Sequence, residues 1–349
     1  DDEEEAPFDP YDFDALLDKR GLDVWHWNDP LIIPNQKKRW KEQEKDRVYR
    51  AVVHIEDNLV VPLADPEMPD LRPSDNPLVA VGGSSVPYLK QATWDGWYAD
   101  LYAVDLKTGE RKMVTERVPS GRSRSGSLSP DGRFVIFYRD GDWFLHDVVK
   151  NEARNLTADL GVPFANEDHD YPADPPGYGQ AEWLADSSAV FIYDKYDIWK
   201  VFADQRSPVK LTQGREKTTI FRVIDLDPDE EVIPSGSPLL LSAYHDLEKH
   251  DAIYSMALDG ENLKPLYATK KHRLGVVAKA EDADRILFTR ERYDEFPDLW
   301  VSNQALEKPA RISNANPQIA DFAWGSAELV EWSSADGVLL QGVLIKPGN

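Results

Sequence analysis

The sequence has no cysteine among its 349 residues. This absence excludes disulfides, thiolate catalysis and cysteine-ligated metal sites. The sequence also has no apolar run close to the ~20 residues that a membrane-spanning helix needs. We therefore expect no membrane span.

Positive charge is scarce. The chain has 40 lysines and arginines against 63 aspartates and glutamates, which gives a net charge of −23. A surplus of negative charge argues against a nucleic acid or an anionic membrane as the main partner. The first residues, Asp1–Glu5, are acidic, which is not the pattern of a signal peptide.

The motifs of several enzyme classes are also missing. A serine hydrolase exposes its nucleophile on a G-x-S-x-G turn, and none of the 20 glycines lies in such a pentapeptide. The nearest approach, Gly121–Gly126, has the wrong spacing, and we interpret it as a loop. There is no phosphate-binding glycine motif, and none of the seven histidines has an evident nucleophile beside it. The sequence thus predicts no catalytic residue in this chain and no cofactor.

The pattern that is present is that of short strands. Helical patterns occur only near the N-terminus, at residues 11–19 and 35–46, and 25 prolines and 20 glycines interrupt the rest. From Val48 onward, short apolar runs alternate with turn signals such as Ser129–Gly132. This alternation is typical of an all-β protein.

One phrase recurs along these strands: an acidic residue, one or two apolar residues, then an aromatic residue. Its copies are Asp100–Tyr102, Asp142–Phe144, Asp197–Trp199, Asp251–Tyr254 and Asp298–Trp300. They lie roughly 40 to 55 residues apart, which is the period of a four-stranded propeller blade. A large β-sandwich is the alternative, but nothing in a sandwich requires the same phrase at blade spacing. We predict an all-β propeller in which the five aromatic residues occupy equivalent, largely buried places.

The repeat also predicts the organisation of the chain. Five full units lie between Leu71 and Ser313, whereas an intact ring would hold six to eight. An incomplete unit, Val48–Leu63, precedes them, and another begins at Asp321–Trp324. Residues 328–345 read as a hairpin. We divide the chain into an N-terminal helical or extended segment (1–46), a propeller (47–325) and a C-terminal segment (326–349).

Several motifs resemble those of a known family. They are Val24–Pro30 (VWHWNDP), Asp197–Trp199, Pro297–Val301, Asn316–Gln318, and the tail Glu331–Gly337 followed by Lys346-Pro347. Together they resemble large bacterial serine peptidases of the prolyl oligopeptidase family. In that family an N-terminal propeller covers a C-terminal α/β-hydrolase domain that carries the catalytic serine, aspartate and histidine.

The resemblance implies a role for each part. Residues 326–349 would be a linker and the first strands of the hydrolase domain, which would be the propeller's partner in the same polypeptide. The propeller would admit peptide substrates, exclude folded proteins and hydrolyse nothing by itself. A periplasmic or secreted location is also implied. We expect Trp25, Trp27 and Trp40 to pack against the first blade or its edge.

Two charged loops supply the candidate binding residues. Exopeptidases of the family often hold the substrate's free amine with propeller carboxylates, through charge-assisted hydrogen bonds. Glu291, Asp294 and Glu295 in one loop, and Glu167 in another, are the candidates. The acidic cluster around Glu167 lacks the D-x-D-x-D-G spacing of a calcium loop, so we expect no metal there.

Two other functions remain open. The first is a free-standing propeller that binds a protein or a glycan without enzymatic activity. The second is a propeller enzyme with acidic residues in its channel, such as a glycosidase, whose paired carboxylates only geometry can identify. The C-terminal segment favours the peptidase, because a propeller alone does not need it.

Overall fold

The computed structural model describes residues 23–120, 126–226 and 230–348. The helical pattern at residues 11–19 and most of the Gly121–Gly126 segment lie outside the described residues. Within them, no helix is long and apolar enough to cross a membrane. The described chain consists mainly of antiparallel sheets of four strands each, with short helices between some of the strands.

Five such sheets follow one another, and we call them blades 1 to 5. Blade 1 holds β3 (Asp70–Arg72), β4 (Val79–Ser84), β5 (Tyr98–Asp105) and β6 (Arg111–Pro119), and blade 2 holds β7 (Gly126–Leu128), β8 (Phe134–Arg139), β9 (Asp142–Asp147) and β10 (Glu152–Asn155). Blade 3 holds β11 (Gln180–Leu184), β12 (Ala189–Tyr193), β13 (Ile198–Phe202) and β14 (Val209–Lys210). Blade 4 holds β15 (Thr219–Val223), β17 (Leu239–His245), β18 (His250–Met256) and β19 (Lys264–Ala268). Blade 5 holds β20 (Arg273–Lys279), β21 (Ile286–Arg292), β22 (Glu295–Ser302) and β23 (Ala310–Arg311).

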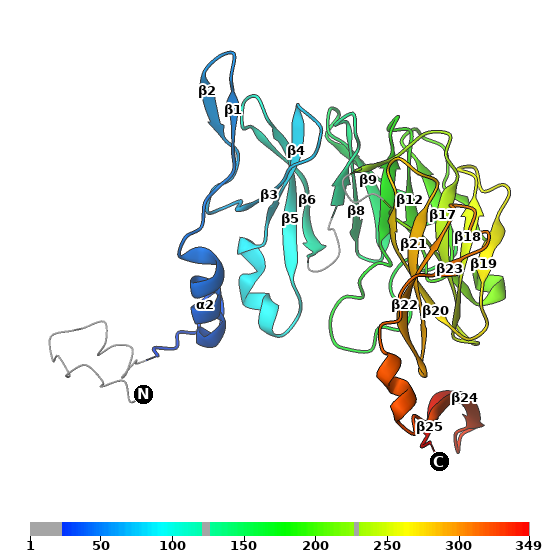
Figure 1. The fold of residues 1–349 in the computed structure, drawn as a ribbon. Helices are drawn as coiled ribbons and strands as arrows, with labels where there is room; N and C mark the ends of the chain where they lie inside the picture. The colour runs from blue at the N-terminus through cyan, green and yellow to red at the C-terminus, as the bar shows by residue number, and fades with distance from the viewer. Residues whose placement is uncertain (1–22, 121–125, 227–229, 349) are drawn as a thin grey trace, which may run out of the picture.

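The blades confirm the predicted all-β propeller fold. In each blade the strands pair in chain order, and every copy of the repeated phrase lies on or at the start of the third strand. Figure 1 shows blade 1 at the left, blade 2 next to it and blade 4 at the right, with the orange strands of blade 5 overlapping blades 3 and 4 in this view. In the described part of the chain, apolar clusters join each blade to the next, and none joins blade 5 to blade 1.

The aromatic residue of each phrase occupies an equivalent place, as predicted. The aromatic side chain packs against the blade that precedes it in the chain or, in blade 1, against the segment before the blade. In blades 1 to 4, the side chain just before the aromatic residue packs against the next blade, because neighbouring residues on a strand point to opposite faces. In blade 3, for example, Trp199 packs with blade 2 and Ile198 with blade 4. Trp199 is buried, and Tyr102, Phe144, Tyr254 and Trp300 are partly buried and pack against the apolar clusters between blades.

The acidic residue of the phrase joins the third strand to the segment that follows the fourth. In blades 2, 3 and 5 its carboxylate accepts a hydrogen bond of 2.6 Å from a hydroxyl fifteen residues later. The same hydroxyl accepts the backbone N–H of the residue after the acid. The three pairs are Asp142–Thr157, Asp197–Thr212 and Asp298–Ser313. We call this arrangement the acid–hydroxyl latch.

Three elements depart from the expected pattern. β16 (Val232–Ile233) leaves blade 4 and pairs in parallel with β11 of blade 3. A 3₁₀ helix, η2 (Val86–Thr93), connects β4 to β5. The unit expected at residues 321–324 is absent, because η4 (Pro317–Asp321) and an extended segment take its place. Proline at the start of η4 favours a helical turn there, since its fixed φ suits a first helical position.

The N-terminal segment contains the predicted polar helix, as α2 (Ile33–Arg39) and η1 (Trp40–Glu44). The incomplete unit is a two-stranded hairpin of β1 (Ala51–His54) and β2 (Leu59–Pro62), and Val61 packs on blade 1. The expectation for the tryptophans was wrong. Trp25, Trp27 and Trp40 are 61%, 86% and 60% exposed, and the Lys90 ammonium of η2 lies 5.5 Å from the Trp27 ring.

The C-terminal hairpin consists of β24 (Ser326–Ser333) and β25 (Leu339–Lys346), as predicted. Gly337 closes its turn with a positive φ of 84°, which an L-residue adopts only with strain. Figure 1 shows the hairpin below blade 5, reached through η4. Its apolar side chains are exposed on both faces; Val338, Leu339, Val343 and Ile345 are all more than half exposed.

Candidate functional site

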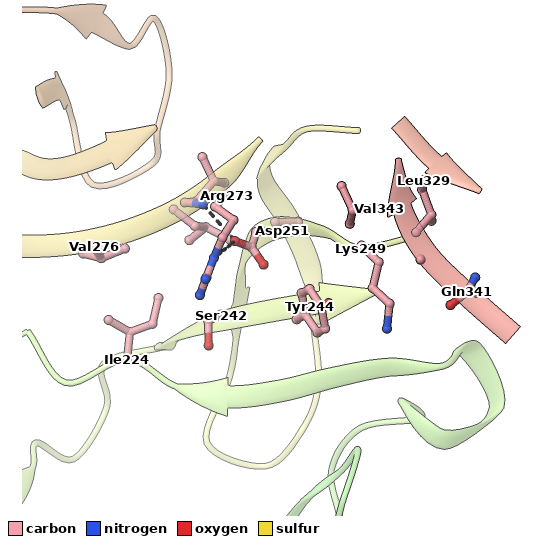
Figure 2. Close-up of a pocket in the computed structure, with 14 residues that line it drawn as sticks. Ile224, Ser242, Tyr244, Lys249, Asp251, Arg273, Val276, Leu329, Gln341 and Val343 are labelled. Carbon is pink, nitrogen blue, oxygen red and sulfur yellow. Dashed lines mark hydrogen bonds and ion pairs between the residues drawn. The ribbon is translucent and has the colours of Figure 1, made fainter. Parts of the chain in front are cut away.

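A cavity of about 780 Å³ lies between the propeller and the C-terminal hairpin. We call it the main pocket. Strands of blades 4 and 5 form one wall, and β24 and β25 form the other (Figure 2). Ile224, Val276, Leu329 and Val343 supply apolar surface. A concave, mostly apolar site with a few polar groups is the usual form of a ligand pocket.

Asp251 is the central polar group of this pocket. Its carboxylate accepts the backbone N–H of Leu274 at 2.8 Å and lies 3.9 Å from the guanidinium of Arg273. Burial raises the pKa of Asp251, and the negative charge of Glu291 adds to this effect. A carboxyl group with a raised pKa can donate a hydrogen bond when protonated and accept one when ionised.

Two cations flank Asp251. The Arg273 side chain is 78% exposed, so most of its five donors are free to meet a ligand. Lys249 forms an ion pair of 3.1 Å with Asp246 and also lines the pocket. Figure 2 shows Arg273 close to Asp251, and Lys249 on the side nearer the hairpin.

One direct hydrogen bond joins the hairpin to the turn between β17 and β18. The Gln341 amide donates to the carbonyl of Leu247 at 3.1 Å and to the Glu331 carboxylate at 2.7 Å. The hairpin wall of the main pocket thus rests on the propeller through Gln341.

The structure brings two of the predicted site residues together at a second, smaller pocket. Asp294 and Glu295 lie at the β21–β22 turn, with Arg290 and Trp300 around a cavity of about 320 Å³. Both carboxylates already have cationic partners there. Asp294 pairs with Arg292 at 2.6 Å, and Glu295 pairs with Arg292 at 2.9 Å and with Arg290 at 3.5 Å.

The electrostatics of Glu295 follow from these partners. Burial alone would raise the pKa of Glu295, but a hydrogen bond to His272 and the charge of Arg292 hold it below its usual value. The His272 ring lies 3.2 Å from the carboxylate. A substrate amine would therefore have to displace an arginine to reach this group, which opposes binding.

The other two predicted residues lie elsewhere. Glu291 pairs in register with Arg273 across β20 and β21, beside the main pocket. Glu167 lies in the long connection between β10 and β11, where it forms a two-point ion pair with Arg215 at 2.6 and 3.2 Å. Arg215 also approaches the buried carboxylate of Asp194 at 3.4 Å. Recognition of a substrate amine by these four carboxylates stays a prediction.

Sequence reasoning missed Asp251 as a site residue, although the repeat contains a signal for it. In blades 2, 3 and 5 the acid of the phrase has a serine or threonine fifteen residues later, whereas Leu266 stands at that position after Asp251. Blade 4 therefore cannot form the acid–hydroxyl latch. Its acid is left to bind elsewhere, and it faces the main pocket.

Comparisons with known proteins gave matches only among solved structures. No family model and no curated protein matches the chain. A protein described as a dipeptidyl aminopeptidase IV from Bacteroides ovatus is 12% identical, with a TM-score of 0.46, over 88% of this chain and 42% of its own length. Prolyl oligopeptidase B from Galerina marginata is 12% identical, with a TM-score of 0.44, over 78% and 39%.

TolB from Acinetobacter baumannii is also similar, at 14% identity and a TM-score of 0.35, over 76% of this chain and 64% of its own. The chain thus spans about two fifths of the length of the two peptidases and less than two thirds of TolB. The fold described above rests on the chain's own strands, and these similarities identify no activity.

Proposed function

We propose that this chain is the propeller part of a serine peptidase that resembles the prolyl oligopeptidase family, and that the main pocket holds peptide substrates. The observation that carries the proposal is the position of this pocket. One wall is propeller, and the other is the hairpin whose sequence resembles the start of the family's hydrolase domain. A ligand in the pocket would therefore lie where a hydrolase domain would begin.

The chemistry of the pocket suits a short peptide. Arg273 could pair with a carboxylate, and Asp251 could bind a backbone amide or an amine, depending on its protonation. Ile224 and Val276 on the propeller and Val343 on the hairpin could cover apolar side chains. Both kinds of contact are available within one cavity of about 780 Å³.

The proposal includes selection by size. A propeller that covers an active site leaves a narrow route for substrate, so that short peptides enter and folded proteins do not. This selection is steric and requires no specific contact. Gating of this kind is a conformational role that supports catalysis elsewhere in the molecule.

The test changes the pocket in the full-length protein that the gene encodes. We expect Arg273→Ala and Asp251→Asn each to raise KM for short peptide amides about tenfold, which corresponds to the loss of about 1.4 kcal/mol of binding. The rate constant kcat should change less, because neither residue would touch the scissile bond. Arg206→Ala is the control, since Arg206 is exposed and lines neither of the two pockets above. An unchanged KM in both pocket variants would contradict the assignment of the pocket.

A further inference from the structure

The turn between β17 and β18 carries two histidines and a glutamate in close proximity. His245 and His250 are directly opposite each other in the strand register, and Glu248 lies in the turn that joins them. The two imidazole rings stack with centroids 5.3 Å apart. One possible metal-ligand atom from each of the three residues lies within 4.8 Å of the others.

The present contacts of His250 and Glu248 leave ligand positions available. The His250 Nε2 atom and the Glu248 carboxylate form a hydrogen bond of 2.9 Å. The His250 Nδ1 atom is buried and has no hydrogen-bond partner.

We propose that His245, Glu248 and His250 form a binding site for one divalent transition-metal ion of the zinc class. Two imidazole nitrogens and one carboxylate oxygen are a familiar ligand set for zinc, and water completes the coordination. Imidazole ligands favour zinc, nickel and copper, whereas magnesium and calcium prefer oxygen ligands alone. The site therefore discriminates between these two groups of ions.

The arrangement also limits the affinity. The His245 Nδ1 atom accepts the backbone N–H of Glu248 at 3.0 Å. A neutral imidazole has one free lone pair, so coordination by either nitrogen of His245 requires that this hydrogen bond be given up. Lys249 and Lys270 add positive charge nearby. We expect a Kd on the order of 10 µM, weaker than that of a four-ligand structural zinc site.

Metal binding would act on the main pocket as well as on the turn. Tyr244, Lys249 and Asp251 line that pocket. Each of them is next to a proposed ligand in the sequence, since Tyr244 precedes His245, Lys249 follows Glu248 and Asp251 follows His250. An ion held by both strands would cross-link the turn and stabilise the folded state, because it binds the unfolded chain less well. The proposal does not depend on the peptidase assignment.

Calorimetric titration of the metal-free 349-residue chain tests the site, with zinc chloride and magnesium chloride as the two probes. We expect one zinc ion per chain, a rise in Tm with zinc, and neither effect with magnesium. His245→Ala and His250→Ala should each weaken zinc binding at least tenfold, and Glu248→Gln several-fold. His26→Ala is the matched control and should bind like the wild type, because His26 lies in the N-terminal segment, far along the chain from the turn.

Two results would overturn the proposal. One is a wild-type chain that binds no zinc below 1 mM. The other is a His245→Ala/His250→Ala double variant that binds zinc as the wild type does. If an alanine variant unfolds, His250→Asn is used in its place. The absorption spectrum of bound cobalt is then measured for the wild type and for this variant. A wild-type cobalt spectrum without the features of imidazole coordination would overturn the site. An unchanged cobalt spectrum in His250→Asn would equally overturn it.

Discussion

At the scale of single residues, the acid–hydroxyl latch explains the acid of the sequence phrase in blades 2, 3 and 5. Asp298 illustrates it in blade 5. Its carboxylate accepts the Ser313 hydroxyl at 2.6 Å and the Ala315 N–H at 2.9 Å, and it pairs with Arg311 at 2.6 Å. These partners fix the segment that follows β23 against β22. A buried carboxylate with this many donors is more stable ionised than protonated.

This latch predicts a pH dependence. The hydrogen bond from Ser313, with the Ala315 N–H and the Arg311 charge, lowers the pKa of Asp298 below its ordinary value of 3.8. The folded state therefore binds this proton less readily than the unfolded state. The stabilisation is present above the ordinary pKa and is lost as pH falls through the lower, folded-state pKa.

We expect Asp298→Asn to lower the free energy of unfolding by about 1–2 kcal/mol at pH 7. This difference should shrink as the pH falls below the ordinary pKa of 3.8, because the unfolded wild type then takes up a proton that the folded state still excludes. Urea unfolding across that pH range measures both proteins. Asp321→Asn is the control, since Asp321 is exposed. A difference between wild type and Asp298→Asn that stays constant with pH would contradict the latch.

Residue-level prediction succeeded where the sequence repeats and failed where contacts are specific to one blade. The phrase at Asp197–Trp199 was enough to place a strand and its neighbours. The partner of Glu167, Arg215, lies 48 residues further along the chain, where no local pattern connects the two. The partners of Glu295, Arg290 and Arg292, are close in sequence, but only the hairpin geometry shows that they pair with it. The sequence thus indicated that these carboxylates are charged and on loops, but not that each is already paired.

At the scale of elements, the interfaces between blades hold the fold together. Ile136 and Trp143 of blade 2 meet Ile192 and Trp199 of blade 3 in one cluster of buried side chains. Strand positions could be predicted because alternation and turn residues are local signals. The parallel strand β16 could not, since it pairs with the preceding blade over two residues only. The helix η2 also lies in a connection that the repeat does not specify.

The blade interface predicts a large effect for Trp199→Ala. Trp199 is 7% exposed, its indole N–H donates to Asp194 at 2.8 Å, and its ring packs edge-on against Phe164. Removal of the side chain should cost about 3–5 kcal/mol through lost burial and a cavity. Chemical denaturation measures the change. Trp94→Ala is the control and should change the free energy of unfolding by less than about 0.5 kcal/mol, because Trp94 is 68% exposed. Similar losses of stability in Trp199→Ala and Trp94→Ala would contradict the placement of Trp199 between blades 2 and 3.

At the scale of the whole molecule, two surfaces set this propeller apart from a self-contained one. The hairpin of β24 and β25 exposes apolar side chains on both faces, and an isolated two-stranded hairpin is marginal in water. Exposed tryptophans, including Trp27 and Trp94, lie in the N-terminal segment and beside η2. Large exposed apolar surfaces of this kind usually mark interaction sites. A hydrolase domain that continues from the hairpin is the partner that our proposal assigns to it.

The measurement that tests this account most directly compares the 349-residue chain with the full-length product of its gene. Both are assayed on dipeptidyl and aminoacyl chromogenic amides and labelled with a serine-directed fluorophosphonate. We predict that the chain alone shows neither turnover nor labelling, because it has no nucleophile turn. The full-length protein should label on a downstream serine, cleave short peptides and spare folded proteins. Labelling of a serine within residues 1–349 together with turnover, or a gene that encodes no hydrolase sequence after residue 349, would contradict the account and favour a free-standing binding propeller.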